Sequence, residues 1–176
     1  MTILTANAEE ARWWKGNLHT HSLWSDGDDY PEMITDWYRS NDYNFLGISD
    51  HNILAEGERW IHVEKNAGGR TAFEKYLKRF GPDWVDHKIE KNLPQVRLKT
   101  FAEYQGKMNV PGKFLLMQAE EITDRFQGFP IHLNATNLKK HIAPKGGTSP
   151  SAVLQNNVNA VLEQRNKTGQ PMIPHI

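Results

Sequence analysis

Five segments of the chain have the hydrophobic pattern of β-strands, near residues 17–21, 44–49, 113–118, 130–136 and 171–175. Some are short apolar runs, and in others apolar and polar positions alternate. Between the first two segments, Pro31 is suited to the first position of a helix, and apolar residues follow it at helical spacing. The pattern therefore predicts an α/β fold that begins with a strand–helix–strand unit, whose strands are parallel and whose crossover is right-handed.

A long polar section separates the second predicted strand from the third. Trp60, Ile61 and Val63 recur at approximately helical spacing, as do apolar residues between 73 and 80. We therefore expect two or three helices that end near residue 81, within a helical insertion at about 54–112. His62 and His87 lie in this section, and we assign them ordinary surface or packing roles.

Composition and charge narrow the classes of protein that fit this pattern. A chain of 176 residues can bury a core, and its 21 basic residues balance 21 acidic ones, so a large nucleic-acid footprint is not favoured. The sequence has no cysteine, so metal ligation would rest on nitrogen and oxygen atoms. No apolar run is long enough for a membrane span, and residues 1–10 lack the pattern of an intact signal peptide. We expect a cytoplasmic protein without membrane contact.

Histidine and carboxylate residues stand at or near the ends of the predicted strands. His19 and His21 are two positions apart, and residues at this spacing in a strand project from the same face. His51 follows the run at 44–49, and Glu121 follows the run at 113–118. Active sites of parallel sheets lie at the carboxyl ends of strands. Because imidazole and carboxylate groups bind transition metals, this arrangement indicates a metal site.

The order of these elements resembles that of the PHP family, named for polymerase and histidinol phosphatase. The matching elements are His-x-His at 19–21, Ser-Asp-Gly at 25–27, Asp-His-Asn at 50–52, Glu-Ile-Thr at 121–123, His-Leu-Asn at 132–134 and Pro-His at 174–175. The resemblance spans residues 15–176 and leaves residues 1–14 as an N-terminal extension. It implies a metal-dependent phosphoesterase on a TIM-like, distorted (β/α)7 barrel.

The resemblance also implies which residues hold the metal ions. His19 and His21 resemble the pair that binds a first metal, and Glu121 resembles the carboxylate that bridges it to a second. His132 and His175 resemble the remaining ligands of the second metal. In this pattern Glu121 is both a metal ligand and a catalytic residue. The cofactors implied are two or three divalent ions of zinc, manganese or iron.

A third metal and its surroundings involve residues near the first two strands. Asp26 and His51 match the positions that hold the third metal, where many relatives have a histidine in place of Asp26. Asp50 resembles a catalytic-site residue that orients a ligand. Asp26 and His51 complete the set of metal ligands that the resemblance implies.

Two basic residues are candidates for contact with a substrate phosphate. Arg125 lies close behind Glu121. Lys145 lies in a basic, glycine-containing loop, and Ser149 after it is typical of a helix start, where phosphate can bind. The alternative for Lys145 is an ordinary solvated loop.

The chain departs from the family pattern towards its C-terminus. Family members carry a late Asp-x-His element, which would complete the first and third metals and has no counterpart here. Five predicted strands are also fewer than the seven of the family barrel. We expect a partial PHP domain, similar to the first two thirds of the family domain, with open sheet edges.

Three functions fit these observations. The first is an enzyme that hydrolyses a small phosphomonoester or a nucleotide-derived phosphate through a metal-bound hydroxide. The second is a degenerate or truncated metal-binding domain without turnover, since the late Asp-x-His element is missing. The third is an amidohydrolase acting on carbon–nitrogen bonds, which also begins with a strand-borne His-x-His. A small phosphorylated substrate is the partner that we expect, and nothing in the pattern indicates an oligomeric state.

Overall fold

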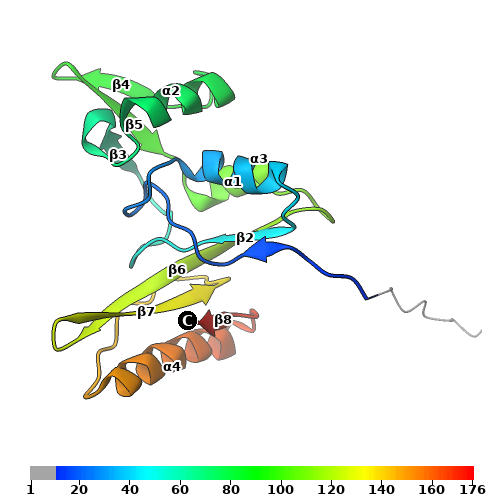
Figure 1. Ribbon diagram of the computed structural model, residues 1–176, viewed down its shortest axis with the longest axis vertical. Helices are drawn as coiled ribbons and strands as arrows, with labels where there is room; N and C mark the ends of the chain where they lie inside the picture. The colour runs from blue at the N-terminus through cyan, green and yellow to red at the C-terminus, as the bar shows by residue number, and fades with distance from the viewer. Residues whose placement is uncertain (1–10) are drawn as a thin grey trace, which may run out of the picture.

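The computed structural model describes residues 11–176, which form a curled five-stranded half-barrel sheet, a separate three-stranded sheet and four α-helices (Figure 1). The strand order in the larger sheet is β1-β2-β6-β7-β8, and in the smaller sheet it is β3-β5-β4. The mixed α/β class predicted from the sequence is confirmed. Most of the predicted N-terminal extension, including the segment in which we found no signal peptide, lies outside the described residues.

The predicted strand–helix–strand unit is present at the start of the larger sheet. Strand β1 (Gly16–Asn17) pairs in parallel with β2 (Phe45–Ile48), and α1 (Pro31–Ser40) connects them with a proline in its first turn. The first strand is shorter than predicted. His19 and His21 therefore follow β1 in an extended loop segment instead of lying within the strand.

Strand β6 (Leu115–Phe126) has two partners along its twelve residues. Its first four residues pair in parallel with β2, and residues 119–126 pair antiparallel with β7 (Phe129–Thr136). The connecting residues Gln127 and Gly128 have φ angles of 49° and 86°, as the two central residues of a type I′ hairpin turn require. A hairpin therefore joins these strands where a strand–helix repeat was expected, and Glu121 lies within β6 instead of at its exit.

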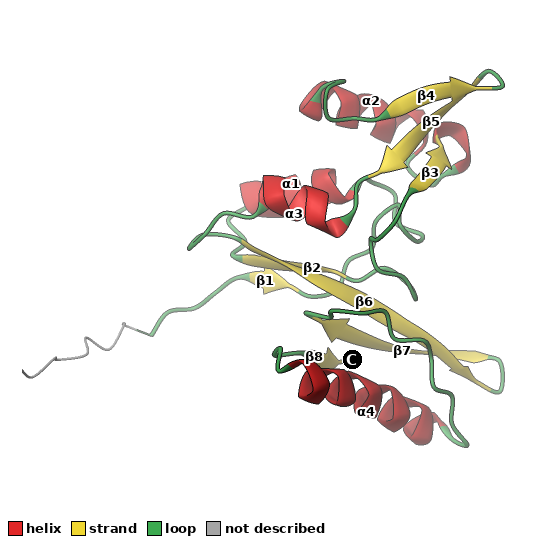
Figure 2. Ribbon diagram, turned by 180° about the vertical axis from the view of Figure 1, so that it is seen from behind, coloured by secondary structure: helices red, strands yellow, loops and turns green. Residues whose placement is uncertain are grey.

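The two faces of the larger sheet have different surroundings. Alternate residues of β6, including Leu116 and Ile122, face the helices, and we call this the outer face. Figure 2 shows α1 and α3 (Phe101–Met108) over β2 and β6, and α4 (Pro150–Thr168) against β7 and β8 (Ile173–His175). Glu121 belongs to the opposite, inner face of the sheet, which no helix covers in the described part of the chain.

The section between β2 and β6 contains strands as well as helices. Its elements before α3 are β3 (Arg59–His62), a 3₁₀ turn (Val63–Lys65), α2 (Gly69–Phe80), β4 (His87–Glu90) and β5 (Leu93–Leu98). The helix ending near residue 81 is confirmed, since Gly81 caps α2. The prediction of a purely helical insertion was wrong, because Trp60 and Ile61 lie in β3 and pair with β5.

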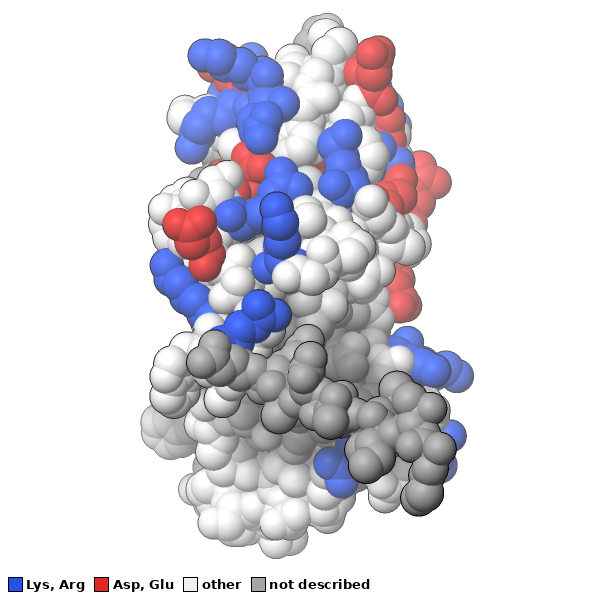
Figure 3. All heavy atoms as spheres, turned by 90° about the vertical axis from the view of Figure 1, so that its right-hand side faces the viewer, with Lys and Arg blue, Asp and Glu red and all other residues white. Residues whose placement is uncertain are grey.

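The distribution of surface charge and the lengths of the helices bear on the expectations about nucleic-acid binding and membrane spans. On the face shown in Figure 3, charged side chains concentrate in the upper half, which contains the inserted sheet and α2, and both signs of charge are present there. Among the helices of residues 11–176, none combines the length and the apolar character needed to cross a bilayer.

Candidate metal centre

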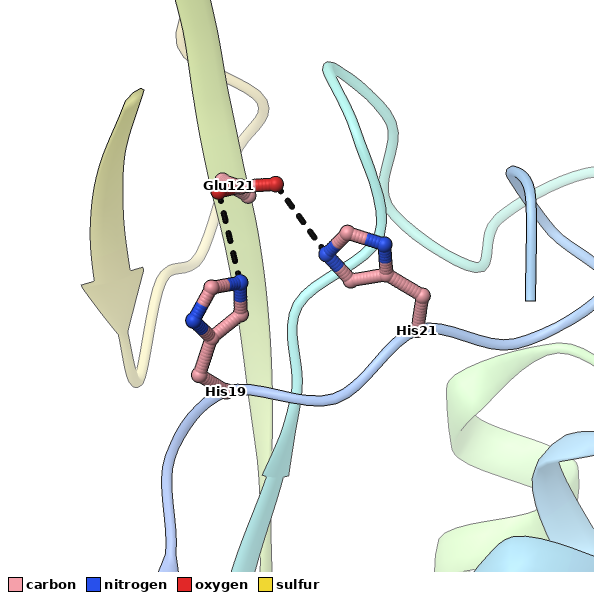
Figure 4. A group of neighbouring side chains, drawn as sticks. All are labelled: His19, His21 and Glu121. Atoms are coloured by element: carbon pink, nitrogen blue, oxygen red, sulfur yellow. Dashed lines mark ion pairs between the residues drawn. The ribbon is translucent and has the colours of Figure 1, made fainter. Parts of the chain in front are cut away.

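Four histidines surround the carboxylate of Glu121, which is only 3% exposed. Its Oε1 lies 3.3 Å from Nε2 of His19 and 3.2 Å from Nδ1 of His132. Its Oε2 lies 3.0 Å from Nε2 of His21 and 2.8 Å from Nδ1 of His51. Figure 4 shows His19 and His21 projecting from one extended segment towards the two oxygens. Each oxygen of one buried carboxylate thus has two imidazoles beside it.

Strand register brings these residues together from four parts of the chain. His51 forms an isolated parallel bridge with Glu121 just beyond the end of β2. His132 lies opposite Thr123 in the β6–β7 ladder, so its side chain is on the same inner face as Glu121. His19 and His21 come from the segment after β1, which runs beside the end of β2 through a hydrogen bond from Ser49 N to Thr20 O. The sheet thereby fixes the cluster.

Donor atoms in this cluster are close enough to hold metal ions. Three groups have donor atoms that all lie within 4.8 Å of one another: His19, His21 and Glu121; His21, Asp26 and His51; and His51, Glu121 and His132. Among the described residues, Oε2 of Glu121 and Nε2 of His21 are buried without a hydrogen-bond partner. A cation between such atoms would satisfy both, and nitrogen and oxygen donors suit zinc, manganese or iron.

Asp26 extends the cluster towards solvent. Its Oδ1 accepts a hydrogen bond from Nδ1 of His21 at 2.8 Å, and its Oδ2 lies 3.5 Å from Nε2 of His51. Partial desolvation would raise the pKa of Asp26, but the hydrogen bond from His21 and the positive charge that His51 and His21 can carry lower it overall. Asp26 and His51 thus lie together, as the third-metal assignment requires.

Asp50 holds the turn that carries Asp26. Its carboxylate accepts hydrogen bonds from the backbone N–H of Ser22 at 2.8 Å, from the Ser22 hydroxyl at 2.7 Å and from the Ser25 hydroxyl at 2.5 Å. Burial raises the pKa of Asp50, although these hydrogen bonds oppose the rise. Asp50 contacts the loop that carries His21 and Asp26 and belongs to none of the three donor groups, so its part in catalysis stays a prediction.

Asn52 is a positioning residue that the sequence analysis missed. Its side-chain amide donates to Thr123 O at 2.9 Å and accepts from Thr123 N at 2.8 Å, which continues the β2–β6 pairing with a side chain in place of backbone. The Thr123 hydroxyl in turn lies 2.5 Å from Nδ1 of His51 and 3.2 Å from Nδ1 of His132. Asn52 has a φ of 49°. The signal available in the sequence was an asparagine directly after Asp-His, because asparagine adopts left-handed backbone more often than most residues.

His175 is near the cluster but outside the three donor groups. It lies opposite Asn134 in the β7–β8 ladder, and its Nε2 is 3.2 Å from the hydroxyl of Thr136. Burial, together with the nearby His19, lowers the pKa of His175 and favours the neutral imidazole, which is the form that binds metals. Its predicted role as a ligand of the second metal stays a prediction.

The two basic candidates lie on different faces of β6. Arg125 is exposed and four positions after Glu121, so it is on the inner face with the cluster. The loop of Lys145 is held on the outer face, where Lys145 N donates to Asn157 of α4 and the next residue donates to Asp124. The structure therefore places Arg125 on the same face of the sheet as the candidate site and Lys145 on the opposite face.

Comparison with models of known protein families gives no match to this chain, and comparison with curated proteins gives none either. The geometry of the histidine and carboxylate cluster is therefore the basis for a functional assignment.

Proposed function

We propose that this protein is a metal-dependent phosphoesterase of the PHP type, acting on a small phosphomonoester or a nucleotide-derived phosphate. The observation that carries the proposal is the pairing of both Glu121 oxygens with two histidines each. A carboxylate in this position is suited to bridging two cations. Two or three ions of zinc, manganese or iron are the cofactors that this donor set fits best.

The fold supports the proposal. The curled sheet places the cluster on its inner face, beyond the end of β2, where open α/β sheets bind ligands. We propose that this half-barrel corresponds to part of a TIM-like, distorted (β/α)7 barrel. The antiparallel β7 is a departure from a regular strand–helix repeat.

The residues around the cluster have distinct chemical tasks in this proposal. Divalent cations would supply a water molecule of lowered pKa and would neutralise charge on phosphoryl oxygens. Glu121, His19, His21, His51 and His132 would hold the cations, and Asp26 would add a ligand on the solvent side. Arg125 would orient a phosphate oxygen from the same face of β6, since its guanidinium group can donate two parallel hydrogen bonds.

A metal-binding domain without turnover is the second candidate. The observation that favours it is that Glu121, His21 and His51 each belong to two of the three donor groups, so each ion would have few ligands of its own. His175 would have to join the cluster to complete a further set. Such a chain would bind metal without the complement needed for hydrolysis.

Metal content and hydrolysis, measured on the same preparations, test the proposal. The protein is loaded separately with Zn²⁺, Mn²⁺ or Fe²⁺, its metal content is measured by elemental mass spectrometry, and hydrolysis of p-nitrophenyl phosphate and bis-p-nitrophenyl phosphate is followed. We expect at least two ions per chain and hydrolysis of the monoester. Tight binding of metal without hydrolysis of either ester would favour the second candidate, and absence of metal would overturn both.

A further inference from the structure

A cavity of about 400 Å³ opens beside the candidate metal centre, between the turn after His21 and the start of the inserted sheet. Ser25 and Asp26 line one side of it, and Arg59, His62 and Lys65 line the other. Asp26 also belongs to a donor group of the cluster, so the cavity and the candidate metal centre share a wall. A ligand held at the metals could therefore extend into this cavity.

The cavity is lined by cations that have no acidic partner. Neither Arg59 nor Lys65 forms an ion pair within residues 11–176, and Asp26 is the one acidic side chain among the described lining residues. The Asp26 carboxylate is itself engaged with His21 and His51. The positive charge of Arg59 and Lys65 is thus available to an anionic group, and the guanidinium fork of Arg59 suits a carboxylate or a phosphate.

The strand that carries Arg59 also favours a polar ligand. Strand β3 is the edge of its sheet, since it pairs with β5 alone, so its free side presents unpaired backbone groups. The segment is held in shape by Asn66, whose side chain donates to His62 O and accepts from Gly69 N.

We propose that this cavity is a second anion-binding subsite, and that the preferred substrates carry a carboxylate or a second phosphate besides the phosphoester that is cleaved. The inference rests on the proposed function. The scissile phosphate lies at the metal cluster, and the second anionic group reaches past Asp26 to Arg59 and Lys65. The insertion then sets substrate specificity, because β3 supplies Arg59 and the 3₁₀ turn that follows it supplies Lys65.

Non-hydrolysable ligands test this subsite without relying on turnover. Binding of 3-phosphonopropanoate, 4-phosphonobutanoate and propylphosphonate to the metal-loaded protein is measured by isothermal titration calorimetry. The first two differ from the third by a carboxylate at two spacings. We expect at least one of them to bind about tenfold more tightly than propylphosphonate, as a charge-assisted pair provides.

The double variant Arg59→Ala/Lys65→Ala should bring that affinity ratio to about one and leave propylphosphonate binding unchanged. Lys139→Ala/Lys140→Ala is the matched control, since it removes two positive charges from an exposed loop away from the cavity and should keep the ratio. A ratio of about one in the wild-type protein, a ratio that survives the double variant, or no binding of any of the three ligands would overturn the subsite.

The outcomes separate this inference from the proposed function. If propylphosphonate binds and phosphoesters are hydrolysed but the carboxylate adds nothing, the subsite is wrong and the phosphoesterase stands. If phosphonocarboxylates bind in a way that depends on Arg59 and Lys65 while no phosphoester is hydrolysed, the subsite stands and the phosphoesterase is wrong.

Discussion

Glu121 and Glu32 are both almost completely buried, with 3% and 0% of their surface exposed, yet their surroundings differ. Glu121 lies on the inner face of the larger sheet among four histidines. Glu32, in α1, accepts hydrogen bonds from the Tyr76 hydroxyl at 2.6 Å and from Nε1 of Trp84 at 2.8 Å. One buried carboxylate is surrounded by metal-binding groups, and the other by neutral donors from the insertion.

The difference shows how the partners of a buried carboxylate decide its role. Tyr76 and Trp84 each donate one hydrogen bond and bind no metal, so Glu32 joins α1 to the inserted module and has a structural role. Burial raises the pKa of Glu32, and the two hydrogen bonds only partly oppose the rise. Imidazoles can instead share a cation with a carboxylate, so the same type of residue becomes a candidate metal ligand in the cluster.

The largest expected effect comes from removing the charge of Glu121. Because Glu121 contributes to two of the three donor groups, Glu121→Gln should lower metal affinity by more than about 100-fold, beyond the usual cost of losing an outer partner of a metal ligand. The measurement is metal content after dialysis, with a chelator competition for affinity. Glu32→Gln is the matched control and should keep the wild-type metal content. If Glu121→Gln retained two ions, Glu121 would not be a metal ligand, and its contrast with Glu32 would be lost.

The histidines around Glu121 should contribute unequally. His132 lies 3.2 Å from Glu121 Oε1, whereas His175 is outside the donor groups. We expect His132→Ala to weaken binding of one ion by about 100-fold and His175→Ala to weaken it by less than about tenfold, since an indirect partner costs less than a ligand. Chelator competition on both variants measures this. Equal losses would show that His175 turns into the site when metal binds, as the PHP resemblance implies.

The site was more accessible to sequence reasoning than the elements around it. His19, His21, His51, Glu121 and His132 stand in short motifs near strands, and strand register then brings them together. The sequence pattern did not indicate that β6 continues past Glu121 into a hairpin, because the turn residues lack the common Asn-Gly or Asp-Gly signature.

The inserted sheet was missed for a different physical reason. All four residues of β4 are exposed and all four of β3 are partly exposed, so neither strand has the alternation of buried and exposed positions that marks a strand in a sequence. Glu32 was equally hidden, because an acidic residue in the first turn of a helix is ordinary at the surface. Only its contacts with Tyr76 and Trp84 reveal that it is buried.

Glu32 should make stability depend on pH in a defined direction. Since burial raises its pKa above the ordinary value of 4.5, the folded state holds the proton more tightly than the unfolded state. Its contribution is therefore favourable below pH 4.5 and is lost as the pH rises through the raised pKa. Glu32→Gln stays neutral, so its stability relative to wild type should rise by roughly 2 kcal/mol across that range, the cost of a poorly compensated buried charge.

Urea denaturation at a series of pH values measures this difference. Glu74→Gln, at an exposed position of α2, is the control and should follow the wild-type curve. If the curves of Glu32→Gln and wild type run parallel over the whole range, Glu32 does not titrate differently on folding, and its contrast with Glu121 does not extend to protonation.

Asn52 supports the histidine cluster without belonging to it, so its effect on metal affinity should be smaller than that of His132. Asn52→Gly keeps the left-handed backbone and removes the two hydrogen bonds to Thr123, whose hydroxyl contacts His51 and His132. We expect metal affinity to fall by about tenfold, which is at the low end of the range for residues that support metal ligands indirectly. We also expect the amide of Thr123 to exchange its hydrogen faster. Asn92→Gly makes the same change at another left-handed asparagine, in the β4–β5 turn, and should alter neither quantity. Faster exchange at Thr123 with unchanged metal affinity would mean that the histidines hold their positions through Glu121 alone. The hydrogen bonds of Asn52 would then have a purely structural role, like those that Tyr76 and Trp84 donate to Glu32.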